Sequence, residues 1–184
     1  VVLAIPRGGL PIGAIVAKTL QAPLDVALSK KIGHPYNREY AIGAVSLENI
    51  ILKDVSGIHK NYIAEETERI REKLKKRHQQ YYQNRQPEDL KDKIVIIIDD
   101  GIATGNTIRV TAEMVRAQKP KKVIVAIPVA PPSAVKSLED SSHIDQVICL
   151  QTPSDFMAVG QFYEFFNQVS DEEAIQLLEE CNVA

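Results

Sequence analysis

Short runs of hydrophobic residues alternate along the chain with longer stretches of helical periodicity. The runs rich in β-branched residues lie at 1–5, 24–28, 94–98, 123–129 and 146–150. This alternation is typical of βα units around a parallel sheet. Because the run 94–98 is apolar at every position, we expect it to be the central strand, covered on both faces. The pattern therefore predicts an α/β fold with a central parallel sheet flanked by helices.

Helical periodicity is clear in three places. The first helix is expected to begin near Leu10, since Pro11 is tolerated in a first turn. A second helix should follow the central strand and end at Lys119-Pro120, and a third should begin at the capping box formed by Ser170 and Glu173. We expect the first helix to pack on the sheet through an apolar stripe of Ile12, Ile15, Val16, Thr19 and Leu20.

Two segments break the alternation. Turn signals at Gly33-His34-Pro35 and Glu48-Asn49 accompany short strand-like runs, which predicts a β-hairpin arm over 33–58. The stretch 60–83 is long and charged, with few apolar residues, and predicts an exposed helix. Its basic cluster 73–77 is typical of a solvated face, and contact with an anion or a partner is the alternative.

Length and composition narrow the class of protein. With 184 residues, 45% of them hydrophobic, the chain 1–184 is expected to form one domain with an appendage. The formal net charge of -2 gives no cationic field, so we expect no binding to nucleic acid. Cys149 and Cys181 show neither metal-ligand spacing nor a disulfide framework, which favours a cytoplasmic location. No apolar run approaches the roughly 18 residues of a membrane span.

The most informative chemistry follows the central run. Asp99 and Asp100 end the predicted strand, at the sheet edge where ligands bind in open α/β folds. Adjacent carboxylates can accept hydrogen bonds from a vicinal diol or approach a divalent cation. Gly101 and Gly105 allow close approach of the backbone, and amides at the start of the next helix can surround a phosphate. Together these features predict a site for a ribose 5-phosphate.

This stretch resembles the phosphoribosyl pyrophosphate motif of type I phosphoribosyltransferases, in which four apolar residues precede two acids and a loop of the form Ala-Thr-Gly-x-Thr. The resemblance implies that Asp99 and Asp100 hold the ribose 2- and 3-hydroxyls and bind Mg²⁺, directly or through water. It also implies that the 5-phosphate is bound by Ala103, Thr104, Gly105, Asn106 and Thr107. Other phosphate-binding motifs, the Gly-x-x-x-x-Gly-Lys-Ser/Thr loop and the Gly-x-Gly-x-x-Gly fingerprint, are absent from the sequence.

A second loop, Pro6-Arg7-Gly8-Gly9, has the same strand-loop-helix context. By itself it is consistent with a simple tight turn. In the resembling family this position holds the pyrophosphate loop, so Arg7 would supply charge while Gly8 and Gly9 would offer amides. The resemblance also predicts a non-proline cis peptide at Arg7-Gly8 or Gly8-Gly9. A basic residue after the second strand reaches the pyrophosphate in this family, and strand alternation favours Lys31 over Lys30.

The resemblance assigns roles to two further segments. The arm corresponds to the flexible loop that closes over the substrate, and closure would exclude water. Its candidate contacts are His34, Tyr36, Arg38, Glu39 and Tyr40. The aromatic segment 151–169 corresponds to the hood that recognises the acceptor, where Phe156 and Tyr163 are candidates for stacking. A small satellite core is the alternative for these aromatic residues.

The implied reaction transfers the phosphoribosyl group from phosphoribosyl pyrophosphate to a nitrogen acceptor, such as a nucleobase, with release of pyrophosphate. Enzymes for hypoxanthine or guanine commonly carry Asp at the position of Ala103, which disfavours these acceptors. Segments such as Ala-Ile-Gly-Ala-Val resemble a less characterised bacterial group of phosphoribosyltransferases. The partners expected are phosphoribosyl pyrophosphate and a small acceptor, and a homodimer is one possible assembly. The rival hypothesis is a regulatory protein of the same fold that senses nucleotides or binds RNA without catalysis.

Overall fold

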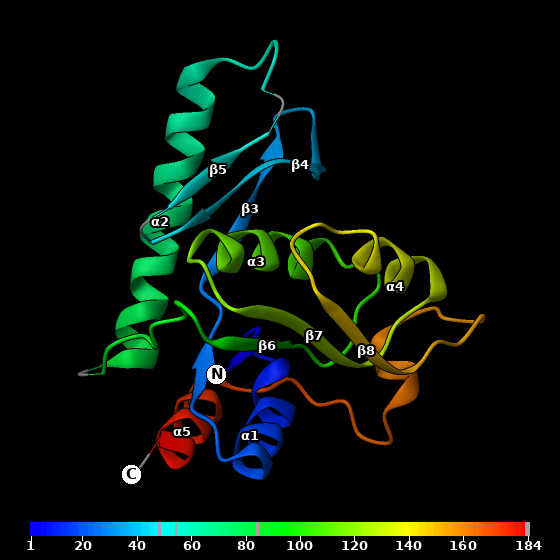
Figure 1. The fold of residues 1–184 in the computed structure, drawn as a ribbon. Helices are drawn as coiled ribbons and strands as arrows, with labels where there is room; N and C mark the ends of the chain where they lie inside the picture. Colours follow the sequence, from blue (N-terminus) through cyan, green and yellow to red (C-terminus); the bar gives the residue numbers. More distant parts are fainter. Residues whose placement is uncertain (48, 54, 84, 183–184) are drawn as a thin grey trace.

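A parallel sheet forms the centre of the computed structural model, which describes residues 1–47, 49–53, 55–83 and 85–182 (Figure 1). Within these residues its strands follow the spatial order β2-β1-β6-β7-β8, and every neighbouring pair is parallel. The strands are β1 (Val2–Ala4), β2 (Leu24–Val26), β6 (Ile94–Ile98), β7 (Lys122–Val129) and β8 (Gln146–Gln151). The five predicted strands are thus confirmed as one sheet.

The apolar run 94–98 is the central strand. β6 pairs with β1 on one side and with β7 on the other. Val95 and Ile97 belong to the hydrophobic cluster on one face of the sheet, whereas Ile98 belongs to the cluster on the opposite face. A continuous apolar run is required at this position because both faces of the strand are covered.

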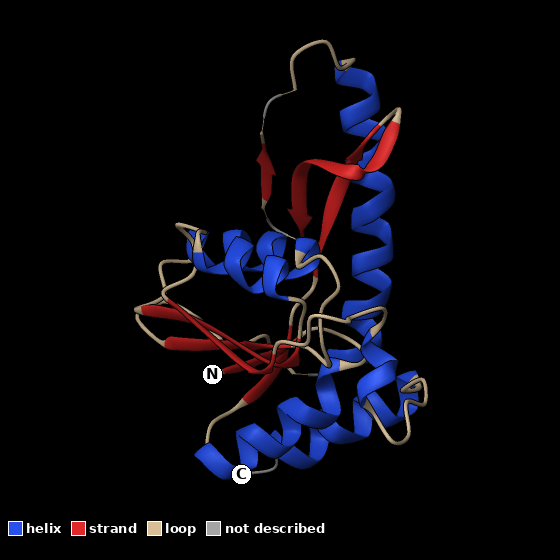
Figure 2. Cartoon of the chain, turned by 90° about the vertical axis from the view of Figure 1, so that its right-hand side faces the viewer, coloured by secondary structure: helices blue, strands red, loops and turns tan. Residues whose placement is uncertain are grey.

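Helices cover both faces of the sheet, as Figures 1 and 2 show. Two helices, α3 (Asn106–Ala117) and α4 (Pro132–Glu139), lie above the sheet in the view of Figure 1. Below it lie α1 (Gly9–Leu20) and α5 (Asp171–Asn182), which also contact each other. The amide of Glu173 donates to the Ser170 hydroxyl over 3.0 Å, so the predicted cap of the last helix is present.

The face of α1 that packs on the sheet differs from the predicted stripe. Ile15 is 67% exposed and Leu20 is also exposed, whereas small residues such as Gly13 and Ala14 are buried. A Cβ atom added to Gly13 would lie 3.0 Å from the Cβ of Ala4. The small residues therefore allow α1 to approach the sheet more closely than a stripe of large side chains would.

The arm is a three-stranded antiparallel sheet in the described residues, not a two-stranded hairpin. It consists of β3 (Ser29–His34), β4 (Asn37–Ser46) and β5 (Ile50–Leu52), in that spatial order. The arm begins at Ser29, because β2 ends at Val26 and the chain turns at once into a strand that pairs with β4. Glu48, part of the expected turn, lies outside the described residues.

The long charged helix α2 (Lys60–Tyr82) packs against the arm. Its residues Ile63, Ile70 and Leu74 are buried in a cluster with Ile32 and Ile42 of the arm. The expectation of an exposed helix therefore holds only for the outer face, because the few apolar residues recur at helical spacing and form one buried edge. Figure 2 shows α2 running from the arm, at one end, to the helices beneath the sheet at the other.

The lower end of α2 is fixed to the sheet through Asp25 of β2. The Tyr82 hydroxyl donates to the Asp25 carboxylate, and the amide of Glu88 donates to its other oxygen over 2.7 Å. Burial raises the pKa of Asp25, although these hydrogen bonds act against the shift. This junction holds α2, and with it the arm, in place beside the sheet.

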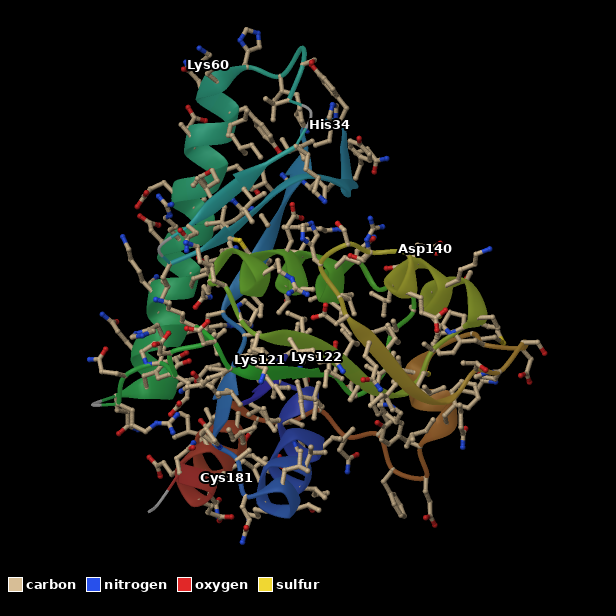
Figure 3. The ribbon with its side chains drawn as sticks, in the orientation of Figure 1. His34, Lys60, Lys121, Lys122, Asp140 and Cys181 are labelled. Carbon is tan, nitrogen blue, oxygen red and sulfur yellow. The ribbon has the colours of Figure 1, made fainter. Side chains whose placement is uncertain are left out.

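No helix in the described part of the chain is both long enough and apolar enough to cross a membrane. Cys149 of β8 and Cys181 of α5 are free thiols, and Figure 3 shows Cys181 on α5, below the sheet.

Candidate active site

The loops that follow β1 and β6 touch each other at the carboxyl edge of the sheet. The two strands are parallel neighbours, with Ala4 opposite Ile98, so their loops emerge side by side. A Cβ atom on Gly8 would lie only 2.0 Å from Oδ2 of Asp100, and one on Gly9 would lie 2.6 Å from the carbonyl oxygen of Ile98. Glycine is thus the residue that permits this contact between the two loops.

Asp99 and Asp100 form a tightly coupled acidic pair at the end of β6. The amide of Asp100 donates to Oδ1 of Asp99 over 2.9 Å. Burial raises the pKa of both carboxyl groups, and the charge of Asp100 raises the pKa of Asp99 further. A pair of this kind favours a cation or hydroxyl donors as its ligand, since either would relieve the repulsion between the carboxylates.

The loop from Ala103 to Thr107 leads into the first turn of α3. Ala103, Thr104 and Thr107 are exposed, and Asn106 is half-buried at the start of the helix. Gly105 has a φ of 74°, a left-handed conformation that favours glycine. The first amides of a helix lack partners within the helix and can bind an anion. Three of the five predicted phosphate-binding residues therefore lie in the loop after the acidic pair, and the other two, Asn106 and Thr107, open α3.

Arg7 is half-buried in the loop after β1, where its Nη1 lies 3.7 Å from Oδ1 of Asp171. The hydroxyl of Tyr81 donates to the same oxygen over 2.9 Å. The loop contains a non-proline cis peptide, but at Pro6-Arg7 instead of at the two bonds expected. The expected bonds already belong to the start of α1, because Gly8 has helical dihedral angles and Gly9 is the first residue of the helix.

Lys31 lies in β3, which brings it to a cavity of about 200 Å³ between the arm and the sheet. Pro6 and Thr107 also line this cavity, so it adjoins both loops. Lys30 lines it as well, and strand alternation therefore does not separate the two lysines. Arg77 of α2 completes the set of cations around the cavity. The sequence placed Arg77 in the basic cluster 73–77, for which contact with an anion was the alternative to a solvated face, but it did not indicate which residue of the cluster faces the site.

The hood packs directly on the acidic loop, the segment after β6 that begins with Asp99 and Asp100. The hydroxyl of Tyr163 donates to the carbonyl oxygen of Asp100 over 2.6 Å. Val159, the first residue of the short 3-10 helix η1 (Val159–Phe162), packs against Gly101, where an added Cβ would lie 2.7 Å from its Cγ1. The ring of Tyr163 lies 5.0 Å from that of Phe166. Tyr163 thus binds the loop backbone through its hydroxyl, a contact that the sequence did not predict.

Phe156, the other hood candidate, is half-buried and stacks on Phe162 with ring centroids 5.6 Å apart. A second cavity, of about 280 Å³, lies between the loop after β1 and the segment that follows the hood. Its lining comprises Arg7, Gly8, Asp100, Phe166, Asn167, Gln168 and Val169. Phe156 and Tyr163 do not line this cavity, and the aromatic residue in its lining is Phe166.

The aromatic residues of the arm lie at its tip. Figure 3 shows His34 at the end of the arm that points away from the sheet. Its ring lies 5.8 Å from that of Tyr36 and 6.2 Å from that of Tyr40, and both tyrosines and Arg38 are exposed. The side chain of Glu39 lies outside the described residues. His34, Tyr36 and Tyr40 thus form a cluster of their own, and they line neither cavity at the loops.

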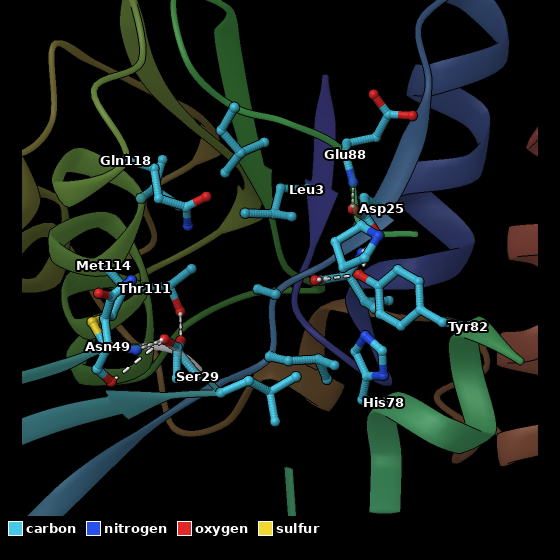
Figure 4. Close-up of a pocket in the computed structure, with 18 residues that line it drawn as sticks. Leu3, Asp25, Ser29, Asn49, His78, Tyr82, Glu88, Thr111, Met114 and Gln118 are labelled. Carbon is cyan, nitrogen blue, oxygen red and sulfur yellow. Dashed lines mark hydrogen bonds between the residues drawn. The ribbon is translucent and has the colours of Figure 1, made fainter. Parts of the chain in front are cut away.

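A third cavity lies behind the connection from β2 to β3 (Figure 4). It measures about 120 Å³, and its lining includes Asp25, His78 and Thr111. His78 is half-buried and stacks on Tyr82 with ring centroids 4.5 Å apart. Asp99, Asp100 and Arg7 are not part of this cavity, which is separate from the acidic loop.

The fold is that of an α/β protein whose two contacting loops lie at the carboxyl ends of parallel strands, the edge at which open α/β sheets bind ligands. The family model "Phosphoribosyl transferase domain" matches residues 1–164. Two Mycobacterium tuberculosis proteins, "Putative phosphoribosyl transferase Rv0571c" of strain H37Rv and "Putative phosphoribosyl transferase MT0597" of strain CDC 1551, are each 38% identical over 187 residues. The crystal structure of TT1426 from Thermus thermophilus is similar over 97% of this chain and 86% of that chain, with 37% identity and a TM-score of 0.91.

This chain therefore belongs to the phosphoribosyl transferase domain family and has the type I phosphoribosyltransferase fold. The match covers 99% of this chain but 42% of each mycobacterial relative, so the chain spans less than half the length of these relatives. The helix α5 lies beyond the residues that the family model matches.

Proposed function

We propose that this protein is a phosphoribosyltransferase that moves the 5-phosphoribosyl group of phosphoribosyl pyrophosphate to a nitrogen acceptor and releases pyrophosphate. The observation that carries this proposal is the contact between the two loops at Gly8 and Asp100. It brings groups suited to a ribose, a phosphate and a pyrophosphate to one edge of the sheet. Membership of the phosphoribosyl transferase domain family supports the same reaction.

In the proposed complex the sugar is held between the acidic pair and the phosphate loop. Asp99 and Asp100 accept hydrogen bonds from the ribose 2- and 3-hydroxyls. The amides and hydroxyls of Ala103 to Thr107 surround the 5-phosphate at the start of α3. These contacts fix the anomeric carbon relative to the acceptor, and orientation of this kind accounts for much of the rate enhancement in transfer reactions.

Pyrophosphate leaves from the other side of the sugar, toward the loop after β1. The acceptor nitrogen forms a bond to the anomeric carbon while the bond from that carbon to the pyrophosphate oxygen breaks, with inversion of configuration. Arg7, Lys31 and the amides of Gly8 and Gly9 stabilise the negative charge on the departing group. The carboxylates of Asp99 and Asp100 offset positive charge that develops on the sugar.

The acidic pair also suits Mg²⁺. Among the described residues no group of three or more His, Cys, Asp or Glu side chains could hold a metal ion. A site with two carboxylates fits Mg²⁺, which retains several waters and commonly binds with substrate phosphates instead of in a cage of protein ligands. Asp99 and Asp100 would hold the ion directly or through water. Bound there, Mg²⁺ would neutralise charge on the pyrophosphate.

The hood is the proposed acceptor region, and a flat nitrogen heterocycle such as a nucleobase is the proposed acceptor. Phe156 remains a candidate for stacking. For Tyr163 the hydrogen bond to Asp100 supports a different role, that of holding the acidic loop beneath the hood. Closure of the arm over the bound substrate, with His34, Tyr36, Arg38 and Tyr40 as contacts, would exclude water from the reacting sugar.

A screen of acceptors tests this proposal. Nucleobases and related amines are incubated with the protein, labelled phosphoribosyl pyrophosphate and Mg²⁺, and the release of pyrophosphate is followed. We expect release that depends on the identity of the acceptor and disappears in Asp100→Asn. Tight binding of phosphoribosyl pyrophosphate without release for any acceptor would instead support the rival hypothesis of a regulatory protein that senses nucleotides.

A further inference from the structure

The helix α2 brings Arg77 to the cavity between the arm and the sheet. The same cavity of about 200 Å³ is lined by Pro6, Lys31 and Thr107, which connect it with both loops of the proposed active site. Leu74, one turn before Arg77, is only 4% exposed and packs against the arm. Because residues three positions apart lie on the same side of a helix, the burial of Leu74 turns Arg77 toward the cavity.

Arg77 and Lys30 both line this cavity, and further cations lie nearby on α2. Burial lowers the pKa of Lys30, and the positive charges of Lys73, Arg77 and Arg69 lower it further. On the other side, burial and the carboxylate of Asp171 raise the pKa of Tyr81 to about 12, while the charges of Arg77 and Arg7 oppose this shift. The charge of Arg77 therefore acts on Lys30, which lines the same cavity.

Among the described residues no carboxylate forms an ion pair with Lys30, Lys73 or Arg77. The acid that acts on Lys30 is Glu66, which already pairs with Arg69. Cations that repel each other beside an open cavity are stabilised when an anion enters it. The cavity is therefore suited to a ligand with more than one negative charge.

We propose that Arg77, together with Lys30 and Lys31, binds the pyrophosphate group of the substrate in this cavity. The inference rests on the proposed function. It adds Arg77, from the helix that packs against the arm, to the binding groups that the loops after β1 and β6 provide. The planar guanidinium of Arg77 can donate two parallel hydrogen bonds to phosphate oxygens, which a lysine cannot. Lys73, one turn earlier on α2, lies outside the lining of the cavity and adds only longer-range attraction.

Isothermal titration calorimetry with inorganic pyrophosphate, in the presence of Mg²⁺, measures this contact directly. Arg77→Ala is compared with Lys76→Ala, which removes the same charge from the preceding position of α2. Both side chains are exposed, but only that of Arg77 lines the cavity. We expect Arg77→Ala to weaken pyrophosphate binding by about tenfold, the effect of losing hydrogen bonds from a charged donor. Lys76→Ala should stay within about twofold, as a screened surface charge.

Steady-state kinetics provides the second readout. In Arg77→Ala the KM for phosphoribosyl pyrophosphate should rise by about the same factor, while the KM for the acceptor stays unchanged. Arg77→Lys should recover part of the binding because it restores the charge without the two parallel hydrogen bonds. Should Arg77→Ala unfold, as judged by circular dichroism, Arg77→Gln replaces it and retains a polar side chain of similar length.

The outcomes separate this inference from the proposed function. Equal pyrophosphate affinities for Arg77→Ala and Lys76→Ala, in a protein that catalyses transfer, would overturn the role of Arg77 and leave the function intact. Weakened binding in Arg77→Ala, in a protein that supports no transfer to any acceptor, would uphold the role of Arg77 and overturn the enzymatic proposal. Failure of the wild-type protein to bind pyrophosphate at all would overturn both.

Discussion

The loop after β6 and the arm with its helix α2 provide binding groups in different ways. In the loop, the acidic pair and the phosphate-binding residues occupy one continuous stretch, 99–107, held between a buried strand and the first turn of α3. In the arm, Lys31 and Arg77 are far apart in the sequence and meet only because α2 packs against β3 and β4. The binding groups of the loop are therefore positioned by local structure, whereas Lys31 and Arg77 are positioned by packing between elements that are distant in the sequence.

This difference determines how each region should respond to change. A substitution in the loop removes a chemical group while the strand and helix around it stay in place. A substitution in the buried edge of α2 weakens the packing that holds the arm and Arg77 in position. We therefore expect the loop to affect mainly catalysis and the arm to affect mainly stability, and the predictions below test this contrast.

The largest effect is expected for Asp100→Asn. Loss of the carboxylate should lower kcat by at least about a hundredfold, or roughly 3 kcal/mol in the barrier. The thermal unfolding temperature should not fall, because the raised pKa of Asp100 shows that its ionised form is disfavoured in the folded protein. Kinetics of transfer and calorimetric unfolding of the same sample measure both quantities. Wild-type turnover would contradict the role given to the acidic pair.

Next in size is the effect of Ile70→Ala on stability. Ile70 is 2% exposed in the cluster between α2 and the arm, so its truncation leaves a cavity and should reduce the free energy of unfolding by about 2–4 kcal/mol. The matched control is Ile15→Ala on α1, where the side chain is largely exposed. Urea unfolding of the two variants measures the difference. Similar losses in both would show that the arm is not held by this cluster.

The loop and the arm also differ in how far the sequence predicts them. The strand 94–98 and the residues Asp99 to Thr107 are predicted because their pattern is continuous and the sheet determines where the strand ends. The contact of Tyr163 with Asp100 and the approach of Arg77 to Lys30 have no local signal, since they depend on the packing of distant elements. The packing face of α1 was predicted wrongly for another reason: the pattern favours large apolar residues, whereas the close approach of α1 to β1 requires a small residue such as Gly13 beside Ala4.

A smaller effect is expected for Tyr163→Phe, because the Tyr163 hydroxyl links the hood to the acidic loop. The substitution keeps the ring beside Phe166 but removes the donor to the Asp100 carbonyl oxygen. One hydrogen bond of this kind contributes about 1 kcal/mol, so kcat/KM should fall by roughly fivefold. Tyr36 lies at the tip of the arm with its side chain 92% exposed. Tyr36→Phe should change kcat/KM little if only the ring, and not the hydroxyl, contacts the substrate when the arm closes. An unchanged kcat/KM in Tyr163→Phe would show that the hood does not position the loop.

The smallest effect is expected for Asp171→Asn in α5, which lies beyond the residues that the family model matches. Its carboxylate orients Arg7 across 3.7 Å, but both side chains are partly exposed, so the pair should contribute less than about 1 kcal/mol. We expect kcat/KM to fall by about threefold at low salt and to approach the wild-type value as salt screens the pair. Asn still accepts the hydrogen bond of Tyr81. Glu172→Gln removes a charge from the same first turn of α5, and an equal loss there would show that Asp171 acts on Arg7 only through the general field of the helix end.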